Sequence, residues 1–305
     1  MDISVIVPVY NERENLPELC ERLHATLKGM RRSYETIFVD DGSRDGSLEL
    51  LLQLRRKHRG MVVVELARNF GQHPAVTAGL EASRGKVIVT LDADLQNLPE
   101  DIPLLVRAID EGNDIASGWR RQRHDSFLRT LPSRIVNRLI SRMTRVKLHD
   151  YGCMLRAHSR PLIDRFLKYG ERSTYITAFM NLLTRKVVEV PVRHASRKHG
   201  SSKYSFVALA RYAVNLMIGF SEYPIQVVSL MGYLFSGVGL ALGGWLLTYR
   251  IVHGTNISGL TSFVAIMLVL FGIQFILLGF MGEYLARIFG EVQKRPRYLV
   301  EKIHR

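Results

Sequence analysis

The chain has 305 residues, 47% of them hydrophobic, so it is long enough for one large or two modest folded domains and its composition excludes a disordered protein. Its formal net charge of +14 suits either a nucleic-acid binder or a protein of the membrane surface. Because the basic residues accompany two long uncharged runs, the distribution favours lipid over nucleic acid as the partner.

Strand and helix patterns alternate over the first hundred residues. Apolar, β-branched runs predict strands over 2–10, 34–43, 61–67 and 86–94, and helical spacing predicts helices over 12–30, 47–60 and 73–85. Nearly uninterrupted apolar strands separated by helices are typical of a parallel sheet covered on both faces. We therefore expect a doubly wound α/β domain, with a further strand in "RKVVEVPVRHASR".

Polar clusters follow each of the first four predicted strands. These clusters are "PVYNE", "DDGSRD", "RNFGQH" and "DADLQ", in chain order. Ligands of open parallel sheets bind beyond the carboxyl ends of the strands, so the four clusters predict one shared site. Within it, Tyr10 offers a ring face for a nucleobase, and Glu12 and Asp41 can accept hydrogen bonds from a base or a ribose.

The apolar run "KVIVTL" ends in two carboxylates, Asp92 and Asp94, separated only by Ala93 and followed by Gln96. Carboxylates this close repel each other unless a cation or a proton intervenes. Mg²⁺ and Mn²⁺ take oxygen ligands, so Asp94 and the amide oxygen of Gln96 are candidate metal ligands, with Asp92 left to meet a ribose hydroxyl. Alternatively, the two acids are helix caps before "LPEDIPLLVRAI".

Several well-defined motifs are absent. The sequence contains no dinucleotide fingerprint, no P-loop, no H-E-x-x-H, no paired C-x-x-C and no G-x-S-x-G. Zinc chemistry and acyl transfer therefore have no support.

The C-terminal third predicts membrane attachment. The runs 225–249 and 254–282 carry no charge, and each exceeds the roughly 20 residues needed to cross a bilayer. The link between them is poor in Lys and Arg, whereas the tail is rich in them, so both ends of this hairpin should face the cytoplasm. Residues 120–147 combine many Arg residues with apolar side chains at helical spacing, which is typical of a helix lying on an anionic lipid surface.

We therefore expect five segments. They are a cytoplasmic domain over 1–203 that includes a basic interfacial helix at about 126–147, a second interfacial helix over 204–223, membrane helices over 225–250 and 258–282, and a basic cytoplasmic tail over 283–305.

The motifs "VIVPVYNE", "DDGSRDGS" and "LDADLQNLPE" resemble glycosyltransferase family two, with its GT-A fold, in the branch that transfers sugars to polyprenyl phosphates. The similarity continues through "RNFGQHPAVTAGL", "DYGCMLRAHSR" and "HGSSKYSF" to "RPRY", and so covers almost the whole chain. It is closest to bacterial members that use UDP-4-deoxy-4-formamido-L-arabinose.

The resemblance implies a set of site residues. The nucleotide-sugar would lie against Pro8, Tyr10, Glu12, Asp41, Asp92, Ala93 and Arg120. The metal, Mg²⁺ or Mn²⁺, would bind Asp94 and Gln96, and the acceptor phosphate would meet Arg120, Arg197, Ser202 and Lys203. Among these, Asp92, Asp94, Arg120, Arg197 and Lys203 would serve catalysis. For each cation, the alternative is a solvated basic face or a lipid anchor.

The implied reaction is inverting transfer of one sugar from a UDP-sugar to undecaprenyl phosphate, at the cytoplasmic face of a bacterial inner membrane. Glucosyl, N-acetylglucosaminyl and mannosyl donors are alternatives, and the missing Q-x-x-R-W signature argues against a polysaccharide polymerase. An acceptor that is already anionic needs no strong base, so we expect structural or substrate-orienting roles for His73 and His199.

Two other classes of function compete with this one. A membrane-anchored nucleotide-sugar sensor or scaffold would keep the fold without turnover, and a basic nucleic-acid binder would show salt-sensitive DNA binding. Residues 171–176, "ERSTYI", could read the sugar or start a helix. Assembly into a homo-oligomer stays open.

Overall fold

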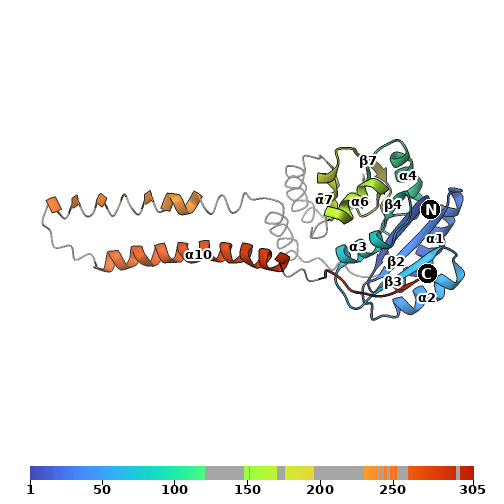
Figure 1. The fold of residues 1–305 in the computed structure, drawn as a ribbon, viewed down its shortest axis with the longest axis horizontal. Coiled ribbons are helices and arrows are strands. Elements are labelled where there is room, and N and C mark those ends of the chain that lie inside the picture. The colour runs from blue at the N-terminus through green and yellow to red at the C-terminus, as the bar shows by residue number, and fades with distance from the viewer. Residues whose placement is uncertain are drawn as a thin grey trace. The chain divides into compact units, whose positions relative to one another are not determined.

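A computed structural model of the chain describes residues 1–120, 148–150, 152–169, 176–195, 260–292 and 296–305, and parts of 230–252. The contacts divide the chain into two units, one formed by Met1–Leu216 with Pro296–Arg305 and the other by Met217–Arg295. The first unit contains the four polar strand ends and both chain termini (Figure 1).

The first unit is built on an eight-stranded sheet in the order β7-β5-β6-β4-β1-β2-β3-β8. Its strands are β1 (Ile3–Val9), β2 (Tyr34–Asp40), β3 (Met61–Leu66), β4 (Val87–Thr90), β5 (Ile115–Arg120), β6 (Arg156–Ser159), β7 (Val187–Val192) and β8 (Val300–His304). Parallel pairing joins β4, β1, β2 and β3, and also β5 with β7. By contrast, β6 runs antiparallel to both its neighbours, and β8 runs antiparallel to β3. The predicted mainly parallel sheet is confirmed.

Helices cover both faces of this sheet. They are α1 (Leu16–Gly29), α2 (Ser47–Lys57), α3 (Gln72–Ala82), the short η1 (Pro99–Asp101), α4 (Ile102–Asp110), α6 (Arg160–Tyr169) and α7 (Ile176–Leu183). Because side chains alternate along a strand, Ile3 and Val5 of β1 join an apolar cluster with α1, α2 and α4, whereas Ile6 joins a second cluster with α3, α6 and α7. The doubly wound architecture follows from this alternation.

The strand patterns in the sequence did not predict β5, β6 and β8. The sequence of β6, "RAHS", has no apolar run, but its side chains are buried or half-buried because the strand lies between β4 and β5. The tail was expected to be simply basic, yet its last residues form β8 at the edge of the sheet beside β3. β6 and β8 are defined by their partners rather than by their own composition.

The second unit contains α10 (Leu260–Val292), a helix of 33 residues that extends beyond the predicted span 258–282. Residues 230–235 are also helical. Within the described part of the chain, no helix combines the length and the apolar character needed for a membrane span. The predicted interfacial helices at 126–147 and 204–223 lie outside the described residues.

Close packing between α3 and the sheet gives a first testable prediction. A Cβ atom at Gly79 would overlap the Cγ2 methyl group of Ile6 and lie 3.2 Å from Cγ2 of Val39. Alanine gains about 1 kcal/mol in helix propensity over glycine, whereas overpacking a core costs about 1–3 kcal/mol. We expect Gly79→Ala to lower the free energy of unfolding measured by urea denaturation.

Gly29 provides the matched control, because it ends α1 and a Cβ there would meet nothing within 4 Å. Gly29→Ala should leave the free energy of unfolding unchanged or raise it. Equal or greater stability of Gly79→Ala relative to the wild-type chain would contradict the packing argument.

Candidate functional site at the carboxyl edge of the sheet

The loop after β1 is bonded to the loop after β2. The backbone N–H of Asn11, a residue at φ 54°, donates to Ser43 Oγ at 3.0 Å, and the N–H of Glu12 donates to Ser47 Oγ at 3.2 Å. The Glu12 carboxylate accepts a bond of 2.7 Å from the Asn15 side chain. These contacts hold Glu12 at the edge where the nucleotide was predicted to bind.

Pro8 and Tyr10 flank the end of β1 at the same edge. Pro8 is paired with Val39 of β2 in the sheet register, and both Pro8 and Tyr10 are half-buried. Their predicted contact with a nucleotide stays a prediction.

Asp41 joins the loop after β2 to the loop after β3. It is 3% exposed, and its two carboxylate oxygens accept the N–H groups of Phe70 at 2.7 Å and Gly71 at 2.9 Å. Burial raises the pKa of Asp41, and the two backbone bonds act in the opposite direction. Next to it, a Cβ on Gly42 would lie 2.6 Å from the carbonyl carbon of Arg68, so only glycine fits this approach. Asp41 thus supports the neighbouring loop, and its predicted base contact stays a prediction.

Asp92 accepts a hydrogen bond from a residue that follows β3. The side-chain amide of Gln72, the first residue of α3, donates to Asp92 Oδ1 at 2.7 Å. Asp92 is half-buried and Ala93 is 5% exposed. Sequence reasoning did not single out Gln72, although it lies within the "RNFGQH" cluster.

The acidic segment after β4 forms a turn rather than a continued strand. β4 ends at Thr90, Leu95 has φ 61°, and Asp94 Oδ1 accepts the N–H of Gln96 at 3.1 Å. The helix-cap interpretation is wrong, because η1 is preceded by Leu98 and α4 by Asp101.

The turn offers oxygen donors of the kind that Mg²⁺ and Mn²⁺ prefer, namely the Asp94 carboxylate and the Gln96 amide oxygen. Asp94 is 7% exposed, so a cation there would be largely shielded from water. Over the described ranges, no group of three or more His, Cys, Asp or Glu side chains is placed to hold a metal ion. A metal held by the Asp94 carboxylate and the Gln96 amide alone would take its other ligands from a phosphate group and water.

The turn formed by residues 92–96 is also bonded to the segment after β7. The backbone carbonyl of Gln96 accepts the N–H of Ala195 at 2.9 Å, and Asn97 forms an antiparallel bridge with His194. One residue earlier, Arg193 donates to Asp101 at 2.7 and 2.9 Å, and Asp101 is 3% exposed. Ala195 is thus bonded to the turn of residues 92–96, and it lies only two positions before Arg197. The predicted residues Arg197, His199, Ser202 and Lys203 themselves lie outside the described residues, as do 171–175.

Arg120 ends β5 and forms a buried ion pair with Asp150. Its Nε and Nη2 donate to the two carboxylate oxygens at 2.6 and 3.0 Å, and the side chains are 13% and 3% exposed. The Asp150 carboxylate also accepts the N–H of Gly152 at 3.1 Å. This two-point pairing sets the orientation of the guanidinium and compensates part of its charge. Sequence reasoning missed Asp150, because nothing local marks it as the partner of a residue thirty positions away.

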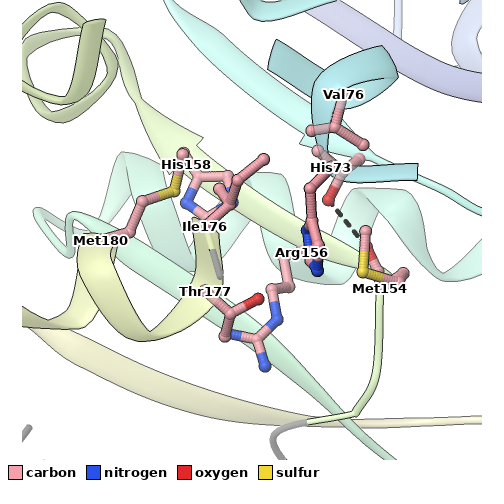
Figure 2. A pocket seen from close by; sticks show the side chains of 9 residues that line it. His73, Val76, Met154, Arg156, His158, Ile176, Thr177 and Met180 are labelled. Atoms are coloured by element: carbon pink, nitrogen blue, oxygen red, sulfur yellow. Dashed lines mark hydrogen bonds between the residues drawn. The ribbon is translucent and has the colours of Figure 1, made fainter. Parts of the chain in front are cut away.

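A small cavity lies between α3, β6 and α7. Figure 2 shows His73, Arg156 and His158 around it, with Thr177 and Met180 contributed by α7. Burial lowers the pKa of His73 to about 4 and that of His158 to about 3, so both rings are neutral near pH 7. The His158 ring is buried and the His73 ring is half-buried, and the structural or substrate-orienting role expected for His73 stays a prediction.

The sequence of this chain is similar to that of a known protein family and of several named proteins. The family described as "Glycosyl transferase family 2" matches residues 4–170. A protein of Pseudomonas fluorescens strain Pf0-1, named undecaprenyl-phosphate 4-deoxy-4-formamido-L-arabinose transferase, is 43% identical over 99% of this chain and 90% of its own. A protein of the same name from Salmonella paratyphi A is 41% identical over 99% of this chain and 93% of its own.

A solved structure also shares the fold. Glucosyl-3-phosphoglycerate synthase from Mycobacterium tuberculosis, in complex with Mn²⁺, uridine diphosphate and glucosyl-3-phosphoglycerate, has a TM-score of 0.52 at 19% identity, over 72% of this chain and 80% of that chain.

The buried pair at the end of β5 gives a second prediction. Removing one partner of a buried ion pair leaves an uncompensated charge and costs about 3–5 kcal/mol, whereas an exposed pair contributes about 0–1 kcal/mol. We expect Asp150→Ala to lower the free energy of unfolding by an amount in the first range. Asp110→Ala is the control, because it removes the exposed Arg32–Asp110 pair, in which the side chains are 30% and 49% exposed. Equal effects of the two substitutions, measured by urea denaturation, would refute the assignment.

Proposed function

We propose that this chain, which belongs to glycosyltransferase family 2, transfers one sugar from a UDP-sugar to undecaprenyl phosphate, with UDP-4-deoxy-4-formamido-L-arabinose as the donor. The observation that carries the proposal is the position of the turn from Asp92 to Gln96. This turn is bonded to Gln72 from the loop after β3 and to Ala195 from the segment after β7. In the proposed arrangement, the segment after β3 lies on the side of the sugar donor and the segment after β7 on the side of the acceptor. Both are bonded to the turn that would bind the metal.

The choice of donor and acceptor is supported by the relatives. Proteins named for this sugar and this lipid phosphate match 99% of the chain at 41–43% identity. Glucosyl, N-acetylglucosaminyl and mannosyl donors remain the alternatives within the same chemistry.

A divalent cation fits the oxygen donors of the turn. When bound there, Mg²⁺ or Mn²⁺ would offset the negative charge of the leaving diphosphate. The solved structure that shares this fold was obtained with Mn²⁺ and uridine diphosphate, which supports such an ion here. In the proposed arrangement Asp94 and Gln96 hold the ion, and Asp92, oriented by Gln72, contacts the nucleotide-sugar.

The acceptor supplies its own nucleophile. A phosphate monoester has a second pKa of about 6, so it is largely dianionic near neutral pH and needs no strong general base. A phosphate oxygen would attack the anomeric carbon while the bond from that carbon to the diphosphate breaks, which releases UDP and inverts the configuration. The protein has to align the two groups and reduce their repulsion.

Cations for this purpose come from two places. Arg120 is held by Asp150, so it would present a pre-oriented but partly compensated guanidinium to the phosphates. Arg197 and Lys203, with the hydroxyl of Ser202, would contact the acceptor phosphate. Their segment continues from Ala195, which is bonded to the turn of residues 92–96.

A lipid acceptor requires the site to work at a membrane surface. We propose membrane helices over 225–250 and 258–282, with basic interfacial helices over 126–147 and 204–223 and the active site in the cytoplasm. The uncharged runs 225–249 and 254–282 support the spans, as do the exposed Phe263, Phe275 and Ile276 of α10.

A donor panel tests the proposal. The purified chain is incubated with undecaprenyl phosphate, Mn²⁺ and labelled UDP-sugars, namely the 4-deoxy-4-formamido-L-arabinose, glucose and N-acetylglucosamine forms. We expect labelled glycolipid chiefly from the first donor. No glycolipid from any donor, together with intact UDP binding, would favour the sensor or scaffold. DNA binding that weakens steeply with salt would favour the nucleic-acid binder.

Asp94 gives a third prediction, which concerns the metal. Asp94→Ala removes a buried oxygen donor from the turn, and we expect turnover to fall by about 100-fold or more at a fixed Mn²⁺ concentration. The control is Asp164→Ala, which changes an exposed acid of α6 outside the site. Near-normal transfer by Asp94→Ala over a Mn²⁺ titration would show that Asp94 is not the ligand.

A further inference from the structure

The C-terminal strand β8 covers an edge of the sheet that would otherwise be open. It pairs antiparallel with β3, from Val63 opposite His304 to Leu66 opposite Val300. Just beyond the strand, the N–H of Ala67 donates to the carbonyl of Leu299 at 3.0 Å. Leu299 and Val300 are 53% and 41% exposed, so backbone pairing rather than side-chain burial holds this segment.

Side chains add contacts at both ends of β8. His304 Nε2 lies 3.1 Å from Glu65 Oε2, and the Arg55 guanidinium donates to the backbone carbonyl of Arg305. At the other end, Tyr298 is half-buried and packs against the apolar cluster that also includes Phe70. The tail therefore contacts the end of β3 and the residues that follow it.

The segment that follows β3 supports two acids of the candidate site. Ala67 is bonded to the tail, Phe70 and Gly71 donate to Asp41, and Gln72 donates to Asp92. The bond to β8 at Ala67 and the bond to Asp92 at Gln72 thus lie within one segment of six residues, 67–72. Displacement of Ala67 would be passed along this short segment to both acids.

We propose that β8 is a positioning element for the donor site, which seats the loop of residues 67–72 so that Gln72 orients Asp92. The inference that the affected ligand is a UDP-sugar depends on the proposed function, whereas the positioning of the loop does not. The tail would act on donor binding, because Asp41 and Asp92 lie on the nucleotide side. The acceptor cations belong to other segments, so the acceptor KM should change little.

A purely structural role for β8 predicts a different pattern. Loss of an edge strand that only stabilises the sheet would lower the melting temperature and the amount of active protein, and so reduce kcat without changing either KM. The donor KM and the amide exchange of residues 67–72 therefore separate the two roles.

The test compares the full chain with a truncated chain that ends at Tyr298 and so lacks β8. Lys302→Ala is the control, because its exposed side chain can be removed without changing the backbone of β8. We expect faster amide hydrogen exchange at residues 67–72 in the truncated chain and a rise of about tenfold in the dissociation constant for UDP with Mn²⁺ and in the donor KM. A synthetic peptide of residues 296–305 should restore both quantities by adding back the strand.

If the truncated chain does not fold, Val300→Pro provides a milder variant. Val300→Ala is its matched control. Proline disturbs the backbone of β8, and alanine removes the same side chain without doing so. Unchanged exchange at 67–72 and unchanged UDP affinity in a variant whose strand is disrupted would overturn the proposal. Exchange is measured without substrate, so a wild-type chain that fails to bind UDP would refute the proposed function separately.

Discussion

Two carboxylates confined to one turn at the end of a buried strand are the constraint on which the site depends. β4 ends at Thr90, and the next residues must place Asp92 and Asp94 where their charges are compensated. The Gln72 amide meets Asp92, the N–H of Gln96 meets Asp94, and the remaining oxygen donors suit a divalent cation. The neighbouring loops are bonded to this turn or to one another, so the charge requirement also explains how the edge of the sheet is organised.

The basic side chains near the site follow the same electrostatic logic. Arg120 and Arg193 each form an ion pair with a largely buried acid, Asp150 and Asp101 respectively. Such pairs add little net stability, because both charges lose hydration, but the planar guanidinium is held in a defined orientation. A phosphate that binds here would meet a guanidinium whose direction is already set.

Sequence patterns predicted the parts of the fold that local chemistry determines. The run "VIVPV" and its counterparts are apolar enough to be recognised as buried parallel strands, and the polar residues after them mark the edge of the sheet. β6 could not be recognised, because "RAHS" is buried only through its neighbours β4 and β5. The pairings of Asp150 with Arg120 and of Gln72 with Asp92 join distant residues, and no local pattern identifies such partners. Excluding the helix-cap interpretation of Asp92 and Asp94 needed the position at which η1 begins.

His158 and His73, which line the cavity between α3, β6 and α7, are poorly suited to act as general bases. His73 and His158 have pKa values lowered to about 4 and about 3, so near pH 7 they carry no charge and are weak proton acceptors. A hydroxyl acceptor would need a base with a pKa closer to the working pH. A phosphate acceptor needs none, because it is already ionised. For the proposed phosphate acceptor, the main tasks of the protein would be alignment and charge compensation.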